Sequence, residues 1–133
     1  RRTQSNSEHA AAILEALDSD ARMIFTNFED TDMLYGHRND PEGFARCLME
    51  FDQTLRRVVG RLGPGDILML TADHGNDPTD ESTDHTREFA PLAVVMPGAT
   101  ITQAYGDKPG FGAVAATAAA WLGLPWRAGE SLA

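Results

Sequence analysis

The sequence predicts an α/β fold: an open, mostly parallel β-sheet flanked by helices in three layers. Segments with helical periodicity alternate along the chain with short apolar segments typical of buried strands. The apolar run at residues 66–72 is nearly continuous, as expected for a strand covered on both faces. A long helical segment separates it from the preceding predicted strand, and a strand–helix–strand connection of this kind forms a right-handed parallel crossover. Ligands bind such sheets beyond the carboxyl ends of the strands.

The first half of the chain contributes two predicted elements before that crossover helix. A helix over residues 5–17 begins with a Ser5-x-x-Glu8 capping box. Its expected apolar face consists of Ala10, Ile13, Leu14 and Leu17. The segment "RMIFTNF", residues 22–28, is short and apolar and is followed by polar residues, which predicts a buried strand.

The remaining elements follow in the same alternating order. Residues 41–62 begin with Pro41, which suits the first turn of a helix. Their apolar stripe consists of Phe44, Cys47, Leu48, Phe51, Leu55, Val58, Val59 and Leu62. Residues 66–72 and 91–98 are predicted strands, and residues 111–124 are a predicted last helix that ends near Gly123.

The composition narrows the class of protein. A chain of 133 residues fits one ordinary domain or a piece of a larger one. The net charge of −9 argues against a nucleic-acid surface, which needs basic patches. No apolar run is long enough to span a bilayer, and the N-terminal residues lack the apolar stretch of a secretory signal. The single cysteine, Cys47, excludes an internal disulfide and suits a cytoplasmic protein.

Two polar clusters, at residues 29–40 and 73–88, follow predicted strands and are expected to be loops at one edge of the sheet. Their carboxylate and imidazole side chains include Asp32, His37, Asp73, His74, Asp84 and His85. This set is large enough for two divalent metal ions, and oxygen and nitrogen ligands without thiolate indicate Mn²⁺, Zn²⁺ or Mg²⁺. Two such ions can clamp the attacking and leaving oxygens of a phosphoryl group.

Other polar side chains near the clusters have a structural interpretation beside a functional one. The expected solvated loop charges are Asp77, Asp80 and Glu81. The residues that either support the site or are purely structural are Tyr35, Arg38 and Arg87. The two arginines also suit bidentate phosphate binding. His9, on the first predicted helix and away from the acidic clusters, is expected at the surface.

The motifs resemble those of a known family. "NFEDTDMLYGHRNDPEGFARCLMEFD" and "LTADHGNDPTDESTDHTREFAPL" are similar to the C-terminal part of phosphopentomutases, in the alkaline phosphatase superfamily. The closing "FGAVAATAAAWLGLPWRAGESL" continues the resemblance, which begins at "TQSN". Asp32 and His37 enclose four residues, as in phosphopentomutases, whereas cofactor-independent phosphoglycerate mutases have one residue fewer. Asn76 departs from the pattern, because phosphopentomutases often have Cys there and "DHGN" is similar to phosphoglycerate mutases.

The resemblance implies an activity and a distribution of roles. The activity is the interconversion of ribose 1-phosphate and ribose 5-phosphate, and of the 2-deoxy equivalents, through a phosphorylated Thr and a bisphosphate intermediate. The implied ligands of one Mn²⁺ are Asp32, His37 and His85. The implied ligands of the second are Asp73 and His74. Asp84 is expected to orient His85 rather than to bind a metal itself.

Family members are considerably longer than this chain. Residues 1–133 are therefore expected to be the C-terminal part of the alkaline phosphatase-like core domain, without the nucleophilic Thr, a further metal-binding Asp and the cap domain. Such a chain is expected to be inactive alone, and to self-associate or pair with the missing part. The expected partner is a sugar phosphate, with no nucleic acid and no membrane.

Two alternatives remain beside this interpretation. One is another member of the superfamily, such as a cofactor-independent phosphoglycerate mutase or a metal phosphatase. The other is a non-catalytic metal-binding or interaction domain, which the absent nucleophile favours for the chain as it stands.

Overall fold

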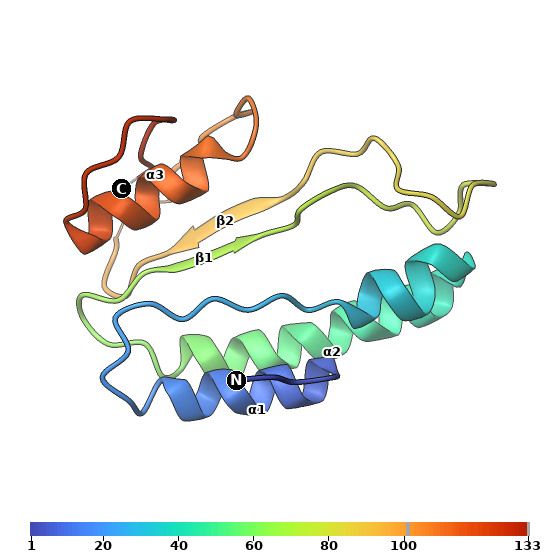
Figure 1. The fold of residues 1–133 in the computed structure, drawn as a ribbon, viewed down its shortest axis with the longest axis horizontal. Coiled ribbons are helices and arrows are strands. Elements are labelled where there is room, and N and C mark those ends of the chain that lie inside the picture. The colour runs from blue at the N-terminus through green and yellow to red at the C-terminus, as the bar shows by residue number, and fades with distance from the viewer. Residues whose placement is uncertain (101, 133) are drawn as a thin grey trace. The chain divides into compact units, whose positions relative to one another are not determined.

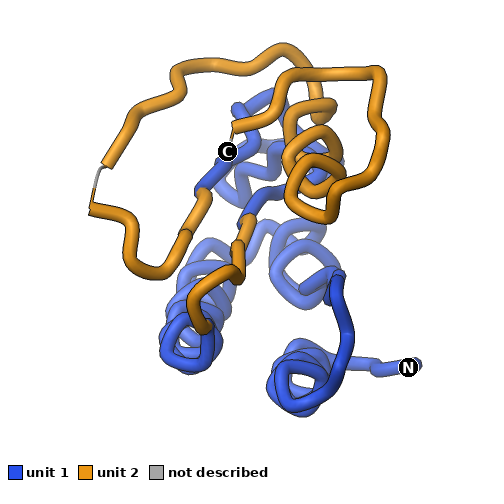
Figure 2. Tube along the Cα trace, turned by 90° about the vertical axis from the view of Figure 1, so that its left-hand side faces the viewer, with its two compact units in different colours: residues 1–62, 70–93 blue, residues 63–69, 94–133 orange. Residues whose placement is uncertain are grey.

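The computed structural model describes residues 1–100 and 102–132. In chain order (Figure 1), its elements are α1 (Asn6–Ala16), the π-helical turn η1 (Thr31–Tyr35), the 3₁₀ turn η2 (Gly36–Arg38), α2 (Pro41–Val59), β1 (Leu68–Thr71), β2 (Leu92–Val95) and α3 (Gly112–Leu122). The chain divides into two compact units (Figure 2), Arg1–Leu62 with Leu70–Ala93, and Gly63–Met69 with Val94–Ala133. None of the helices in the described part is long and apolar enough to cross a membrane.

Helix α1 forms where the sequence predicts it, and its capping differs in one detail. The Ser5 hydroxyl accepts a hydrogen bond from the Glu8 backbone N–H at 3.3 Å, as a capping box requires. The Glu8 carboxylate accepts from the backbone N–H of Gln4 at 2.9 Å rather than from that of Ser5. Two backbone N–H groups are therefore satisfied at this helix end. The bond to Ser5 is in its usual place, and the bond to Glu8 comes from one residue earlier than in a standard capping box.

His9 is buried, so the prediction of a surface position is wrong. Only 9% of the residue is exposed, and its ring meets the Phe28 ring edge-on at 5.8 Å between centroids. Phe28 in turn packs against Phe51 of α2 at 4.7 Å. The helical period explains the burial, because His9 lies one turn before Ile13 on the apolar face of α1. The distance from acidic residues, on which the prediction rested, says nothing about burial.

Helix α2 confirms the prediction of a long helix after Pro41. The Asp40 side chain accepts from the Gly43 backbone N–H at 2.8 Å, and Pro41 occupies the first turn. Cys47 and Val58 are buried on the predicted stripe, and α1 packs along it. The regular helix ends at Val59 with its cap at Gly60, three residues before the predicted end.

The two observed strands are those predicted at residues 66–72 and 91–98, and they pair with each other. They run in opposite directions (Figure 1), and the antiparallel pairing continues in an isolated bridge between Gly75 and Thr86. The predicted mostly parallel, three-layer sheet is therefore not confirmed. No helix lies between β1 and β2 in the chain, and a direct return connection of this kind joins antiparallel strands.

The prediction of a strand over residues 22–28 is wrong for this structure. The segment forms no strand, and Met23, Ile24 and Phe25 are exposed. Apolar composition favours extended backbone, but a strand exists only where a neighbour supplies ladder hydrogen bonds. The cluster after it, predicted as a loop, is helical instead, since η1 and η2 occupy residues 31–38.

The second unit is built around α3, which ends as predicted at Gly123. That residue adopts φ 68°, the left-handed conformation that favours glycine at a helix end. Thr117 is fully buried and serves two partners: its hydroxyl donates to the Ala113 carbonyl at 2.7 Å and accepts from the Leu132 N–H at 2.9 Å. The second bond attaches the C-terminal segment to the helix.

Candidate metal centre

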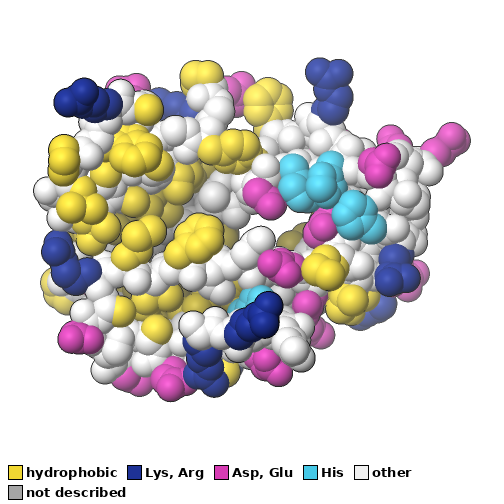
Figure 3. All heavy atoms as spheres, viewed as in Figure 1, with side chains coloured by type: hydrophobic (Ala, Val, Ile, Leu, Met, Phe, Trp, Pro, Cys, Tyr) yellow, Lys and Arg dark blue, Asp and Glu magenta, His cyan; other side chains and the backbone are white. Residues whose placement is uncertain are grey.

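Asp32, His37 and His85 come together although they are far apart in the sequence. One ligand atom from each lies within 4.8 Å of the other two. His37 Nε2 is 3.2 Å from Asp32 Oδ2, and His85 Nε2 is 3.8 Å from Asp32 Oδ1. Figure 3 shows histidine side chains gathered on one face beside acidic side chains. This trio of Asp32, His37 and His85 is the ligand set that the family resemblance implies for one metal ion.

His37 is oriented by a backbone carbonyl. Its Nδ1 lies 2.5 Å from the Thr83 carbonyl oxygen, which can only accept, so Nδ1 carries the hydrogen. In the neutral imidazole, the form that binds metal ions, the lone pair is then on Nε2, the atom that faces Asp32. Metal-binding histidines commonly use this arrangement, in which the second ring nitrogen donates to a carbonyl or carboxylate.

Asp32 is placed by the π-helical turn and held by a neighbouring amide. Single π-helical turns often occur at functional sites. The Asn76 side-chain N–H donates to Asp32 Oδ1 at 2.6 Å. Asn76 can approach this closely because Gly36 has no side chain: a Cβ there would lie 2.8 Å from the Asn76 Cγ.

Asp73 and His74, predicted to bind a second metal, lie beside the trio without joining it. The His74 ring stacks on the His85 ring at 3.5 Å between centroids and 17° between planes. His74 Nε2 faces Asp73 Oδ1 at 3.5 Å. A cavity of about 230 Å³ is bordered by Asp32, Asp73 and His74, so the two predicted ligand sets share one opening. Among the described residues, the only group of three mutually close ligand atoms is the trio itself.

The polar segment from Asn76 to His85 is attached to the turns that carry Asp32 and His37. Besides the Asn76–Asp32 and His37–Thr83 bonds, the Asn39 amide donates to the Asp80 carbonyl at 2.7 Å. Three hydrogen bonds thus join these two segments of the chain, and two of them end on Asp32 and His37 themselves.

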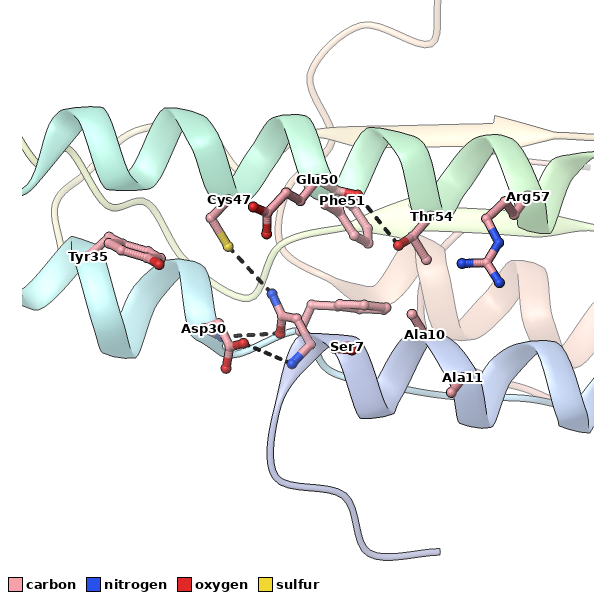
Figure 4. A pocket seen from close by; sticks show the side chains of 12 residues that line it. Ser7, Ala10, Ala11, Asp30, Tyr35, Cys47, Glu50, Phe51, Thr54 and Arg57 are labelled. Atoms are coloured by element: carbon pink, nitrogen blue, oxygen red, sulfur yellow. Dashed lines mark hydrogen bonds between the residues drawn. The ribbon is translucent and has the colours of Figure 1, made fainter.

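The other side of the π-helical turn is anchored to α1 and α2. The Asn6 backbone N–H donates to Asp30 Oδ2 at 2.8 Å, and the Asp30 N–H donates to Asn6 Oδ1 at 3.2 Å. Cys47 of α2 lies 3.6 Å from Asn6 Nδ2 and 3.2 Å from Thr31 Oγ1. Asn6, Asp30 and Cys47 border a cavity of about 380 Å³ between the helices (Figure 4). Both helices therefore position the start of the turn that presents Asp32.

The predicted supporting residues are less engaged. Among the described residues, no hydrogen bond or ion pair is formed by the side chains of Arg38, Asp84 and Arg87. The backbone N–H of Asp84 donates to Ser82 Oγ at 3.0 Å. Their predicted roles at the site stay predictions. Asp77 has an internal role: its carboxylate accepts from the Thr79 hydroxyl at 2.7 Å and backbone N–H at 2.8 Å, and these bonds lower its pKa.

Sequence reasoning missed two contributors to the site. Asn76 departs from the family pattern, and its position directly after Asp73-His74-Gly75 is the signal in the sequence that points to it. Thr83 acts through its backbone carbonyl, which leaves no trace in residue type.

The donor set fits a divalent metal ion. Two imidazole nitrogens and one carboxylate are the ligands that zinc, manganese and related ions accept, and three protein ligands leave coordination positions open for a substrate oxygen. The side chains of Asp32, His37 and His85 expose 27%, 39% and 47% of their surface, so a ligand can reach them.

Comparison with known proteins agrees with this chemistry. The metalloenzyme superfamily model matches residues 1–126. A phosphopentomutase of Anaeromyxobacter sp. (strain Fw109-5) is 46% identical over 130 residues, covering 97% of this chain and 33% of the relative. The phosphopentomutase of Symbiobacterium thermophilum is 44% identical over 137 residues, covering 98% and 34%, and that of Chromohalobacter salexigens is 57% identical over 83 residues, covering 61% and 20%. The chain spans about a third of the length of the first two relatives. With a family model that covers nearly all of its residues, the chain belongs to the metalloenzyme superfamily.

Proposed function

We propose that this chain is the metal-binding part of a phosphopentomutase, which interconverts (deoxy)ribose 1-phosphate and (deoxy)ribose 5-phosphate. The observation that carries the proposal is the agreement of two features. Relatives of that name match 97% or more of the chain at 44–47% identity. The carboxylate and imidazoles of the trio also converge to within 4.8 Å. Residues 1–133 then form the C-terminal part of a core domain in a cytoplasmic enzyme.

In this proposal the trio of Asp32, His37 and His85 holds one divalent ion, and Asp73 with His74 contributes to a second. Mn²⁺ is the proposed metal, and Mg²⁺ or Zn²⁺ fit the same donor types. When bound, the ions would neutralise charge on the oxygens of a phosphoryl group during its transfer. The shared cavity beside Asp32 and Asp73 supports a common substrate position.

The chain's own residues then bind and orient. The Thr83 carbonyl keeps the His37 Nε2 lone pair directed at the metal position, and Asn76 holds Asp32. Arg38 and Arg87 are exposed cations near the histidines in sequence, and we assign them to the substrate phosphate. The proposal assigns no nucleophile to this chain.

The metal proposal is tested by titrating the metal-free protein with Mn²⁺ and following heat or the electron paramagnetic resonance of the free ion. We expect binding that Asp32→Ala and His85→Ala each abolish or reduce strongly. The matched control is Asp52→Ala, which removes an exposed carboxylate on α2 that pairs with Arg56. Equal binding by wild type and both trio variants would overturn the metal assignment.

The activity is tested on the product of the complete gene. We expect conversion of ribose 1-phosphate to ribose 5-phosphate, with no turnover of 3-phosphoglycerate, and loss of that conversion in the Asp32→Ala variant. Turnover of 3-phosphoglycerate instead would favour the second candidate, a cofactor-independent phosphoglycerate mutase. That candidate rests on Asn76, which follows the Asp73-His74-Gly75 segment as in those enzymes and lies in the site.

A further inference from the structure

We infer that Asn76 is a positioning residue that selects how the Asp32 carboxylate presents itself to the metal. The inference rests on the metal site of the proposed function and extends it to a residue outside the predicted ligand set. Its first support is the geometry of the hydrogen bond. The Asn76 amide donates to Asp32 Oδ1 at 2.6 Å, while Oδ2 faces His37 Nε2 at 3.2 Å.

That geometry gives the two carboxylate oxygens of Asp32 different roles. A carboxylate without partners rotates freely and can bind a cation through one oxygen or both. An amide donor occupies Oδ1, fixes the plane of the carboxylate, and leaves Oδ2 as the oxygen nearest His37. Asn76 is neutral, so it sets orientation without adding charge beside the three ligands.

The second support is the space that the backbone reserves for Asn76. A Cβ on Gly36 would lie 2.8 Å from the Asn76 Cγ and would meet its Nδ2 more closely still. Gly36 itself adopts φ −59° and ψ −61°, which any residue adopts. Its conformation therefore does not require glycine, and the requirement comes from the approach of Asn76.

This combination gives a double-mutant test. Asn76→Ala removes the donor, and Gly36→Ala keeps the donor but displaces it. We expect each variant to weaken Mn²⁺ affinity about tenfold, the lower end of the usual effect of removing a residue that orients a metal ligand. We expect the double variant to be no weaker than either single variant, because both act through the same bond.

The matched control is Asn39→Gly. Asn39 joins the same two segments through its amide bond to the Asp80 carbonyl, and among the described residues it forms no hydrogen bond with Asp32, His37 or His85. Glycine accepts the φ of 49° at that position without strain. We expect its Mn²⁺ affinity to stay within about twofold of wild type, well below the effect expected at Asn76.

A second readout separates positioning from general loosening. Co²⁺ substituted for Mn²⁺ reports ligand geometry through its visible absorption, and we expect Asn76→Ala and Gly36→Ala to shift that spectrum alike, while Asn39→Gly preserves it. Thermal unfolding by circular dichroism verifies that each variant is folded.

The inference is overturned if the Asn76→Ala variant keeps the affinity and the spectrum of the wild type. The metal assignment itself stands in that case as long as Asp32→Ala still loses Mn²⁺ binding. An Asn39→Gly variant as weak as Asn76→Ala also overturns it. A wild-type protein that binds no Mn²⁺ overturns both the inference and the metal assignment.

Discussion

Gly75 occupies a position where the backbone of another segment takes the space of a side chain. A Cβ there would lie 2.7 Å from the Glu88 backbone N and 2.8 Å from its carbonyl oxygen, and backbone atoms cannot move aside as a side-chain tip can. The same residue forms the antiparallel bridge with Thr86, through a hydrogen bond of 3.1 Å from the Thr86 N–H to the Gly75 carbonyl. The neighbours of this bridge in sequence are His74 and His85, whose rings stack. Because Gly75 has no side chain, the two segments approach closely enough to form the bridge that places His74 beside His85.

We therefore expect Gly75→Ala to destabilise the fold by about 1–3 kcal/mol through overpacking. Urea unfolding followed by circular dichroism measures the change. Gly63→Ala is the matched control, because its Cβ would meet nothing nearer than the Asp66 carboxylate at 3.7 Å, an ordinary contact. Equal stabilities of the two variants would show that the Glu88 backbone yields without cost.

The Asp77 carboxylate provides a prediction about pH. The Thr79 hydroxyl, and then the Thr79 backbone N–H, hold its pKa below the usual value. A lowered pKa in the folded state stabilises the fold above the unfolded pKa of about 3.9, and that contribution is lost as the pH falls through the folded pKa. We expect Thr79→Ala to raise the pKa of Asp77 toward its ordinary value. Carbon-detected NMR titration of the carboxyl measures this.

Thr54→Ala is the control for that titration. Thr54 is a threonine on α2 whose hydroxyl bonds to the Glu50 carbonyl, so its removal should leave the Asp77 titration unchanged. An Asp77 titration that is the same in wild type and Thr79→Ala would contradict the assigned cause.

At the scale of elements, the start of α2 supports the turns that carry Asp32 and His37. Asp40 caps the helix through Gly43, and a Cβ on Gly43 would lie 2.6 Å from Tyr35 Cε1. Tyr35 is the last residue of η1, so the helix end and the π-helical turn are packed closely together. Removing the Asp40 cap should therefore destabilise the π-helical turn η1 as well as helix α2.

We expect Asp40→Ala to lower the free energy of unfolding by about 1 kcal/mol, the usual cost of losing an N-cap. Asp52→Ala is the control: it also removes an aspartate from α2, but an exposed one whose pairing with Arg56 should contribute no more than about 0.5 kcal/mol. Chemical denaturation measures both. A cost at Asp40 no larger than at Asp52 would mean that Pro41 alone sets the helix start.

The elements also show how far sequence patterns reach. Three helices and two strands formed where periodicity and punctuation predicted them, because caps such as Ser5 and stops such as Gly123 act locally. The strand over residues 22–28 and the parallel sheet did not follow, because strand pairing depends on a partner that residue type cannot identify. The helical turns at residues 31–38 are stabilised by bonds to distant segments, which periodicity does not record.

The candidate site was predictable to the extent that its chemistry lies in residue types. Asp32, His37 and His85 could be grouped from their motifs, and the structure brings them together. The support from the Thr83 carbonyl could not be predicted, since a backbone oxygen leaves no trace in residue type, and only the position of Asn76 directly after Asp73-His74-Gly75 pointed to that residue. The surface position predicted for His9 is wrong because it rested on distance from the acidic clusters, whereas the helix face decides burial.

At the scale of the whole molecule, the extended segment 22–28 combines two features that favour association. It contains consecutive exposed apolar side chains, with Phe25 84% exposed, and it belongs to no sheet. Unpaired extended backbone and a contiguous apolar patch are both surfaces on which another chain can pair or pack. The net charge of −9 opposes self-association only over the screening length, which physiological salt shortens to about 8 Å.

We therefore expect this chain to self-associate as its concentration rises, and Phe25→Ser to reduce that association. Sedimentation velocity over a range of concentrations measures it as an increase in the weight-average sedimentation coefficient. Phe89→Ser is the matched control: Phe89 is 83% exposed, but its neighbours in the chain are Glu88 and Ala90 rather than a run of large apolar residues. We expect it to reduce association much less. A wild-type chain that stays monomeric and unfolds cooperatively at every concentration would contradict the prediction, and an equal effect of both substitutions would show that exposed aromatic area, and not the extended segment, drives association.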